Sequence, residues 1–364
     1  MVIRLRKALF SYQMSSELAG ARLTPNAALV RFKGSDVLTA QKVERRLGEL
    51  LTTHAIDVIN VLQAPGEVVV MVRRPKRTVL GLREMWRRRS MPTGAPETCM
   101  SLLLGAREAN GEMLHLNLGE AFGGQQQHGP HTLIAGETGS GKGILVQNLL
   151  LDICATNSPG LARIVMIDPK AGVDFAWLKG MPHLEGGLLT TQEVAVEALD
   201  GLVAEMERRY LLFSDVGANK ISRYNKMVAP EERLPVVFVF HDELADWMLM
   251  DDYRSAVSTS VNRLGVKARA AGIHLVFITQ RPDKDALPMQ LRANLTNRLV
   301  LKVSDKRNSE LVLDEPGAER LLGQGHLAAK LSGEGGVVLA QVPFLEEEGA
   351  FSLAEAIARA WEDG

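Results

Sequence analysis

A glycine-rich loop between an apolar run and a helical pattern constrains this chain more than any other feature. Leu133–Ala135 predicts a short buried strand, and residues 144–153 predict a helix. Between them, residues 136–142 match the strand–loop–helix context in which backbone N–H groups cradle phosphate. Lys142 would add a positive charge for the β- and γ-phosphates. The pattern predicts a nucleoside triphosphate site formed by Gly136, Glu137, Thr138, Gly139, Ser140, Gly141, Lys142, Gly143 and Ile144.

One position of the loop departs from the usual pattern. A hydroxyl residue that ligates Mg²⁺ normally follows the lysine, and this chain has Gly143 there. Asp242 and water molecules would then supply more of the metal ligands. Thr138 and Ser140 lie in the same loop, although the reach of their side chains is a matter of tertiary structure. We predict ATP and Mg²⁺ as cofactors and expect Gly143→Ser to be tolerated; a chance glycine-rich loop is the alternative.

Length and composition predict a two-domain globular protein. The chain has 364 residues, of which 46% are hydrophobic, enough for two cores. Its two cysteines, Cys99 and Cys154, have neither a metal-binding spacing nor a disulfide framework. No apolar run approaches the roughly 20 residues of a membrane span, and no signal peptide is recognisable. These features predict a cytoplasmic protein without a membrane span.

Charge is distributed unevenly along the chain. Residues 1–90 hold 17 Lys and Arg against 7 Asp and Glu, whereas the remainder holds 25 against 36. The basic part ends in the runs Arg73–Arg77 and Arg87–Arg89. Such a basic region predicts contact with a polyanion. A solvated charged face, or a docking surface for the acidic remainder, is the alternative.

The first ninety residues predict a small α+β domain. Strands at residues 28–32, 56–62 and 68–72 and an amphipathic helix at 39–52 give a β-α-β-β order. Before them, a weak pattern predicts only a short helix around Ser15–Ala21. A linker helix over Leu80–Arg89 leads to the cluster Met91–Pro96, which marks a predicted domain boundary because Pro and Gly interrupt regular structure.

The remainder alternates strands with helices. Continuous apolar strands of this kind predict a mostly parallel sheet covered on both faces, with ligands bound beyond the carboxyl ends of the strands. The strands are expected at residues 163–167, 235–240, 273–278, 299–303 and 337–340, and the helices at 192–214 and 251–271.

Two adjacent acids close one of these apolar strands. Phosphoryl transfer needs a carboxylate that holds Mg²⁺ and a base that orients the attacking water. We assign Asp242 to the metal and Glu243 to the water. Gln280, at the end of the next strand, is placed to sense the γ-phosphate, with a structural helix cap as its alternative. His241 precedes the acids, and a packed core histidine is favoured over a functional one.

Arginines that could complete the site of a neighbouring subunit are also present. The candidates are Arg269, Arg281 and Arg298, each of which has a solvated surface position as its alternative.

Several stretches together resemble the motor of the FtsK/SpoIIIE family of DNA translocases, over roughly residues 26–345. They are Gly136–Lys142, Ile167–Lys170, Met181–Leu184, Ala204–Tyr210, Asp242–Asp246, Lys267–Leu275, Thr279–Pro282 and Gly317–Gly325. The resemblance implies a RecA-like P-loop NTPase fold, a homohexameric ring around double-stranded DNA, and ATP sites between subunits. It also implies that Arg269 acts in trans and that Gln280 is the sensor.

The chain is predicted to divide into a small basic α+β domain, a linker with the entry to the motor, a RecA-like ATPase domain and a C-terminal helix, with the ranges 1–90, 91–130, 131–345 and 346–364. By the resemblance, residues 26–80 correspond to the family's small α domain and residues 97–345 to its RecA-type β domain. Departures from the family pattern are Gly143, His241 and Glu310. The protein is also expected to lack the membrane-spanning and winged-helix domains of the family's cell-division members. Loops ending in Lys-Gly occur in relatives on mobile elements.

These features predict an ATP-driven double-stranded DNA translocase that serves plasmid, phage or other mobile-element transfer. Its partners would be a recombinase, a relaxase or a secretion or packaging apparatus. Two alternatives are kept. One is a ring ATPase that moves protein in a secretion system. The other, motivated by Gly143, is a nucleotide-gated DNA-binding protein with weak hydrolysis.

Overall fold

The computed structural model describes residues 1–90 and 95–362, and the chain divides into two compact units. One unit comprises residues 1–80 and 106–112, and the other comprises residues 81–105 and 113–364. The predicted boundary cluster at 91–96 lies largely outside the described residues. The proposed division at residues 90/91 therefore stays a prediction. Within the described ranges, every helix is too short or too polar to cross a bilayer.

The N-terminal unit is a four-stranded antiparallel sheet with helices packed against it, in the strand order β1-β2-β4-β3. Its core includes Leu5, Phe32, Val43 and Val70, all fully or almost fully buried. The elements are α1 (Val2–Ser11), β1 (Leu18–Leu23), β2 (Ala27–Lys33), α2 (Ala40–Glu44), α3 (Leu47–His54), β3 (Val58–Ala64) and β4 (Glu67–Arg73).

The predicted β-α-β-β order is found as β2, α2 with α3, β3 and β4, and the structure adds α1 and β1 before it. The predicted helix at Ser15–Ala21 is wrong, because Leu18–Leu23 is an edge strand that pairs antiparallel with β2. Backbone pairing along β2 overrides the weak local helical pattern. The helix α1 was not predicted, although Leu5, Ala8 and Leu9 form its buried face. The predicted helix at 39–52 is two helices, α2 and α3.

The second unit is built on a ten-stranded sheet in the order β6-β5-β14-β13-β12-β7-β11-β10-β8-β9. The six strands from β12 to β9 run parallel, and β13 and β14 are antiparallel additions. The strands are β5 (Ser101–Arg107), β6 (Met113–Asn117), β7 (Thr132–Ala135), β8 (Ala162–Ile167), β9 (Leu184–Leu189), β10 (Val236–His241), β11 (Ile273–Thr279), β12 (Asn297–Val300), β13 (His326–Lys330) and β14 (Val337–Gln341).

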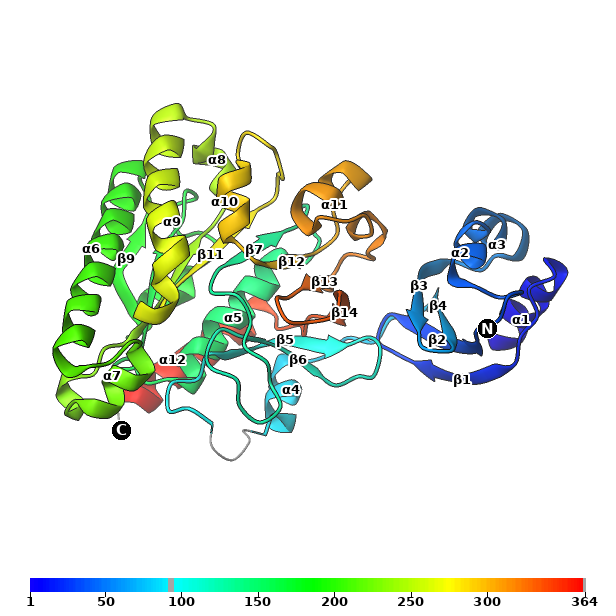
Figure 1. Ribbon diagram of the computed structural model, residues 1–364, viewed down its shortest axis with the longest axis horizontal. Helices are drawn as coiled ribbons and strands as arrows, with labels where there is room; N and C mark the ends of the chain where they lie inside the picture. The colour runs from blue at the N-terminus through cyan, green and yellow to red at the C-terminus, as the bar shows by residue number, and fades with distance from the viewer. Residues whose placement is uncertain (91–94, 363–364) are drawn as a thin grey trace. The chain divides into compact units, whose positions relative to one another are not determined.

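Helices cover both faces of this sheet. The long helices α6 and α9 lie side by side on one face, and α5 and α12 pack together on the other (Figure 1). The helices are α4 (Leu82–Arg88), α5 (Lys142–Thr156), α6 (Gln192–Val216), α7 (Ile221–Met227), α8 (Leu244–Met248), α9 (Asp251–Ala271), α10 (Met289–Asn294), α11 (Lys306–Leu313) and α12 (Glu347–Glu362), with short 3₁₀ turns η1 (Ala176–Gly180), η2 (Pro230–Glu232) and η3 (Ala318–Arg320).

The predicted α/β class is confirmed: the large sheet is mostly parallel, and a small α+β unit precedes it. Every residue of β10 and β11 is buried, which explains why these strands read as continuous apolar runs. The strands β5 and β6 were not predicted. They extend the sheet beyond β14, at the side away from the phosphate loop.

Candidate functional site

Strand order brings the predicted site residues to one edge of the large sheet. The phosphate loop leaves the carboxyl end of β7, and the two acids follow the carboxyl end of β10. β11 lies between these two strands, so Gln280 at its end falls between the loop and the acids. The chain order β7, β10, β11 therefore differs from the spatial order, and only the latter explains the grouping.

The phosphate loop has the backbone conformation that its glycines allow. Gly139 and Gly141 have φ values of 78° and 102°, which residues with a Cβ rarely adopt. A Cβ on Gly141 would also lie 2.5 Å from the backbone nitrogen of Gly325, which donates a 2.7 Å hydrogen bond to the carbonyl of Ser140. Gly325, in the Gly317–Gly325 stretch that resembles the family, thus packs against the phosphate loop and donates a hydrogen bond to it.

Lys142 opens α5 and points into this edge. Its side chain is only 7% exposed, and its Nζ lies 4.0 Å from Glu243 Oε2. Burial lowers the pKa of Lys142, while the carboxylates of Asp242 and Glu243 oppose that shift. The ammonium of Lys142 is a compact point charge that suits a triphosphate, and the neighbouring carboxylates offset part of its positive field.

Asp242 lies in a group of charges larger than the sequence analysis assigned. Its Oδ2 lies 3.8 Å from the Nζ of Lys170. Burial raises the pKa of Asp242, and the charges of Lys142 and Lys170 partly offset this. Asp168 is fully buried at the end of β8, and its Oδ1 accepts a hydrogen bond from the backbone nitrogen of Lys170. Asp168 and Lys170 lie in the Ile167–Lys170 stretch of the family resemblance, directly after the predicted strand at 163–167, and that position was the available signal.

Glu243 has an uncommon backbone conformation, and its side chain is bonded to the end of the neighbouring strand. Its φ of 37° lies in the left-handed region, which is costly for a residue with a Cβ. The backbone N–H of Gln280 donates a 3.0 Å hydrogen bond to Glu243 Oε1. The side chain of Gln280 lies 2.8 Å from the hydroxyl of Thr138 in the phosphate loop. Gln280 thus connects the loop to Glu243.

Three buried oxygens at this edge lack a hydrogen-bond partner, and they test whether a metal–nucleotide complex fits. They are Ser140 Oγ, Asp168 Oδ2 and Glu243 Oε2. Buried polar atoms in native proteins are normally satisfied, so a cluster of unsatisfied ones suggests a ligand site. No group of three or more His, Cys, Asp or Glu placed to hold a metal occurs among the described residues. The donors suit Mg²⁺, which is usually held by one or two carboxylates, phosphate and water.

The two residues after Lys142 differ in exposure. Gly143 is exposed, and a Cβ built on it meets no atom within 4 Å. Ile144 is partly buried in the first turn of α5. The missing hydroxyl at Gly143 is therefore not explained by a lack of room.

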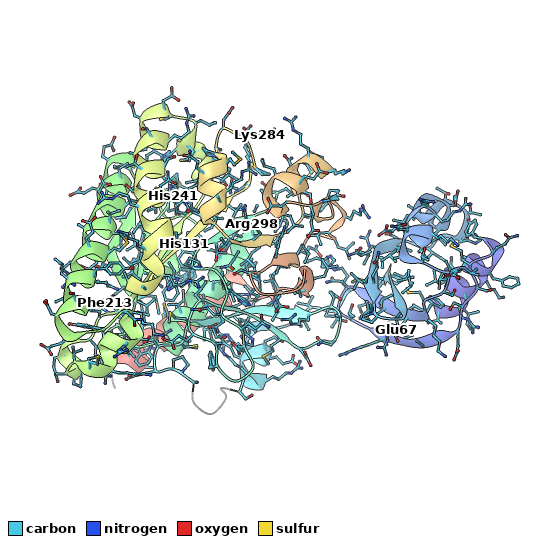
Figure 2. The ribbon with its side chains drawn as sticks, viewed as in Figure 1. Glu67, His131, Phe213, His241, Lys284 and Arg298 are labelled. Carbon is cyan, nitrogen blue, oxygen red and sulfur yellow. The ribbon has the colours of Figure 1, made fainter. Side chains whose placement is uncertain are left out.

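The arginine candidates occupy three different places. Arg269 lies near the end of α9 and donates a 2.8 Å hydrogen bond to the carbonyl of His128, at the amino edge of the sheet, opposite the phosphate loop. Arg281 follows β11 at the carboxyl edge and is exposed. Arg298 is 6% exposed in β12 and donates a 2.7 Å bond to the carbonyl of Arg292 (Figure 2). Arg298 therefore does not join the site, and a role for Arg269 in a neighbour's site stays a prediction.

The basic stretch of the N-terminal unit is partly used inside that unit. Arg74 donates a 2.6 Å hydrogen bond to the carbonyl of Thr24, and Arg77 donates one of 2.6 Å to Asn26 Oδ1. Asn26 in turn contacts the buried carboxyl of Glu108. Burial raises the pKa of Glu108, and its hydrogen bonds and nearby arginines oppose this. Arg74 and Arg77 therefore have a structural use inside their own unit, which neither the predicted polyanion contact nor its alternatives included.

Sequence comparisons agree with this geometry. Residues 109–284 match the FtsK/SpoIIIE family. A protein named DNA translocase FtsK from Streptococcus agalactiae is 32% identical over 355 residues, covering 94% of this chain and 42% of that protein. Its namesake from Campylobacter jejuni is 40% identical over 232 residues, covering 63% of this chain and 24% of that protein. The chain thus spans less than half the length of these relatives.

Solved structures share the fold. The conjugation coupling protein TcpA of pCW3, solved with ATPγS, superposes with a TM-score of 0.67 at 22% identity, covering 99% of both chains. The cytoplasmic domain of the Type VII secretion ATPase EccC from Thermomonospora curvata gives a TM-score of 0.64 at 23% identity, covering 77% of this chain and 34% of that one. The chain therefore contains an FtsK/SpoIIIE family domain with a P-loop NTPase fold.

Proposed function

We propose that this chain, as a member of the FtsK/SpoIIIE family, is an ATP-driven motor that moves double-stranded DNA. The observation that carries the proposal is the convergence of Lys142, Asp242 and Glu243 at one sheet edge, with 4.0 Å between Lys142 Nζ and Glu243 Oε2. Lys142 opens α5 after β7, whereas Asp242 and Glu243 follow β10, about a hundred residues later in the sequence. A positive charge, a metal-binding carboxylate and a base in one place are what phosphoryl transfer to water requires.

Each residue has a proposed role in hydrolysis. Lys142 and the N–H groups of the loop bind the β- and γ-phosphates. Glu243 orients the attacking water and accepts its proton. Gln280 is placed to report the state of the γ-phosphate to Glu243, because it contacts both Thr138 and Glu243. Asp242 would hold Mg²⁺ through water. The ion would, when bound, neutralise charge on the phosphate oxygens.

Assembly completes the site in this proposal. Copies of the chain form a ring, proposed from the family to be a hexamer, with Arg269 of one subunit reaching the nucleotide of the next. The position of Arg269 at the amino edge supports a trans role, because that edge is opposite the phosphate loop of its own subunit.

The DNA substrate is supported by the curated relatives at 32% and 40% identity, which are named DNA translocases. The excess of basic residues in the first ninety positions is consistent with sequence-independent contact with phosphates. The more specific role that we propose is in the cytoplasm. There the motor would transfer a plasmid, phage or other mobile element together with a recombinase, relaxase or packaging apparatus. The Lys142-Gly143 ending of the loop motivates this role.

A protein-moving ring ATPase is the second candidate. It is favoured by the fold shared with a secretion ATPase, which at 23% identity is more distant in sequence than the DNA translocases. Nucleotide-gated DNA binding with weak hydrolysis is the third, motivated by Gly143.

Turnover measured with and without duplex DNA tests the proposal. We expect duplex DNA to stimulate ATP hydrolysis, and we expect Lys142→Ala to reduce stimulated turnover by about 10²-fold or more, because a preorganised charge at the phosphates is lost. Lys226→Ala is the matched control, since Lys226 is exposed on α7. Turnover that ignores DNA and is equal in the Lys142→Ala variant and the wild type would refute the motor. DNA-independent hydrolysis that does need Lys142 would favour the secretion candidate.

A further inference from the structure

The residue before the two acids, His241, is buried in a polar arrangement that hydrolysis as described above does not use. Its side chain has no exposed surface at the end of β10. The imidazole packs at ring-centroid distances of 5.8 Å from Trp247, 6.0 Å from Tyr253 and 5.7 Å from Phe277. Figure 2 labels His241 beside α9, the helix that carries Tyr253. An apolar side chain would fill such a pocket without needing any hydrogen bond.

Both ring nitrogens of His241 have hydrogen-bond partners. Nδ1 lies 2.9 Å from the carbonyl oxygen of Asp242, and Nε2 lies 2.6 Å from the hydroxyl of Tyr253, in the first turn of α9. A carbonyl can only accept, so Nδ1 carries the proton and Nε2 of a neutral ring accepts from Tyr253. Burial favours this neutral ring, since it lowers the pKa of His241 to about 4. The chain of donors therefore runs from Tyr253 through His241 to the backbone of Asp242.

The carbonyl at the end of this chain belongs to a strained turn. It is part of the peptide unit that joins Asp242 to Glu243, and Glu243 has φ 37° and ψ 53°. Fixing this peptide plane restricts the direction in which the Glu243 side chain leaves the backbone, because the plane ends at the Cα of Glu243. Left-handed backbone at a residue with a Cβ is costly and persists only where the surroundings determine it. The His241 bond is one of those determinants.

We propose that His241 and Tyr253 act as a positioning pair that holds the Asp242–Glu243 turn, and hence Glu243, in the orientation required for hydrolysis. This inference rests on the proposed hydrolytic function. The pair also ties the start of α9 to the turn, so a shift of that helix would reach Glu243 through two hydrogen bonds. His241 touches no reacting atom and acts only through its neighbour.

A packing role alone is the competing explanation, and paired substitutions separate the two. In Tyr253→Phe, Nε2 of His241 is left without a partner, whereas in His241→Phe both the Tyr253 hydroxyl and the Asp242 carbonyl lose theirs. In the double variant His241→Phe/Tyr253→Phe, the imidazole and the hydroxyl are replaced together by apolar rings, so only the Asp242 carbonyl loses its donor. The double variant therefore removes the hydrogen bond to the turn at a smaller cost in stability than His241→Phe alone.

The experiment compares these variants in the full chain by three measurements: thermal unfolding, affinity for ATPγS, and DNA-stimulated turnover. For the double variant we expect a melting temperature above that of His241→Phe and an ATPγS dissociation constant close to wild type. We expect kcat to fall about tenfold or more, because small displacements of a catalytic group are costly. His241→Asn restores a donor near Nδ1 while leaving a smaller side chain. It should recover kcat relative to His241→Phe, although its melting temperature is lower than that of His241→Phe.

Two results would overturn the inference. Wild-type kcat in the double variant would show that the pair only fills the core. A kcat that follows melting temperature across all variants, with His241→Asn no better than His241→Phe, would show the same. A wild-type protein without turnover would instead refute the proposed function itself, so the two failures are distinguishable.

Discussion

The carboxyl edge of the large sheet and the basic stretch of the N-terminal unit are both rich in charge, yet their charges are used differently. At the sheet edge, Lys142 and Asp242 are buried and adjacent oxygens on Ser140, Asp168 and Glu243 have no hydrogen-bond partner. In the basic stretch, Arg74 and Arg77 donate to groups of their own unit. At the sheet edge, buried polar atoms therefore lack partners within the protein, whereas Arg74 and Arg77 of the basic stretch already have theirs.

This difference teaches how to separate a binding site from a structural network. Burying charge and leaving polar atoms unsatisfied costs free energy, which a folded protein tolerates where a ligand provides the missing interactions. Charges that already have partners within their unit contribute to its stability instead. A density of charged residues in a sequence does not distinguish these cases.

The largest expected effect, and the sharpest test of the sheet edge as a site, is that of Glu243→Gln. The amide keeps the shape of the side chain but cannot accept a proton from water. We expect turnover to fall by about 10²-fold or more, with ATPγS affinity retained. Glu207→Gln is the matched control, since Glu207 is 60% exposed on α6 and pairs with Arg263. If hydrolysis continued at the wild-type rate in Glu243→Gln, the base would have to be sought elsewhere.

An intermediate effect would test the basic stretch as a structural network. Arg77→Ala removes the donor to Asn26 and a charge beside buried Glu108, so we expect the N-terminal unit to lose about 1–3 kcal/mol. Lys76→Ala, at the exposed neighbouring position, should leave stability unchanged. Hydrogen exchange of β2 and β4 measures this unit separately from the other. Equal protection of β2 and β4 in the two variants would contradict the structural role of Arg77.

The Lys76→Ala variant also tests contact with DNA. If the salt dependence of its DNA binding changes by about one ion, Lys76 contacts a phosphate.

The smallest expected effect is that of Gly143→Ser. A Cβ at this position meets nothing within 4 Å, and serine is the better helix former in the first turn of α5. We expect turnover within about threefold of wild type and a melting temperature that is unchanged or slightly higher. The Mg²⁺ concentration needed for half-maximal turnover is the informative measurement, because the added hydroxyl is a potential ligand. Loss of turnover in this variant would show that the glycine is a required adaptation.

Several features were predictable from sequence because they depend on local pattern. The loop between β7 and α5 follows from its glycines, and the apolar runs of β8, β10 and β11 follow from burial on both faces of the sheet. The pairing of Asp242 with Glu243 at a strand end was visible for the same reason. The edge strand β1 was mistaken for a helix because its conformation depends on pairing with β2, outside any local window.

The sequence by itself determined that this chain has a phosphate loop, two acids and a mostly parallel sheet. The placement of glycines and the spacing of hydrophobic residues can be recognised within short segments. Only the tertiary structure decided which charges meet. It inserted β11 between β7 and β10, brought Asp168 and Lys170 to the acids, separated Arg298 from them, and gave His241 a partner in α9. The physical reason is that strand order and helix packing are set by the burial of whole faces, which no single segment specifies.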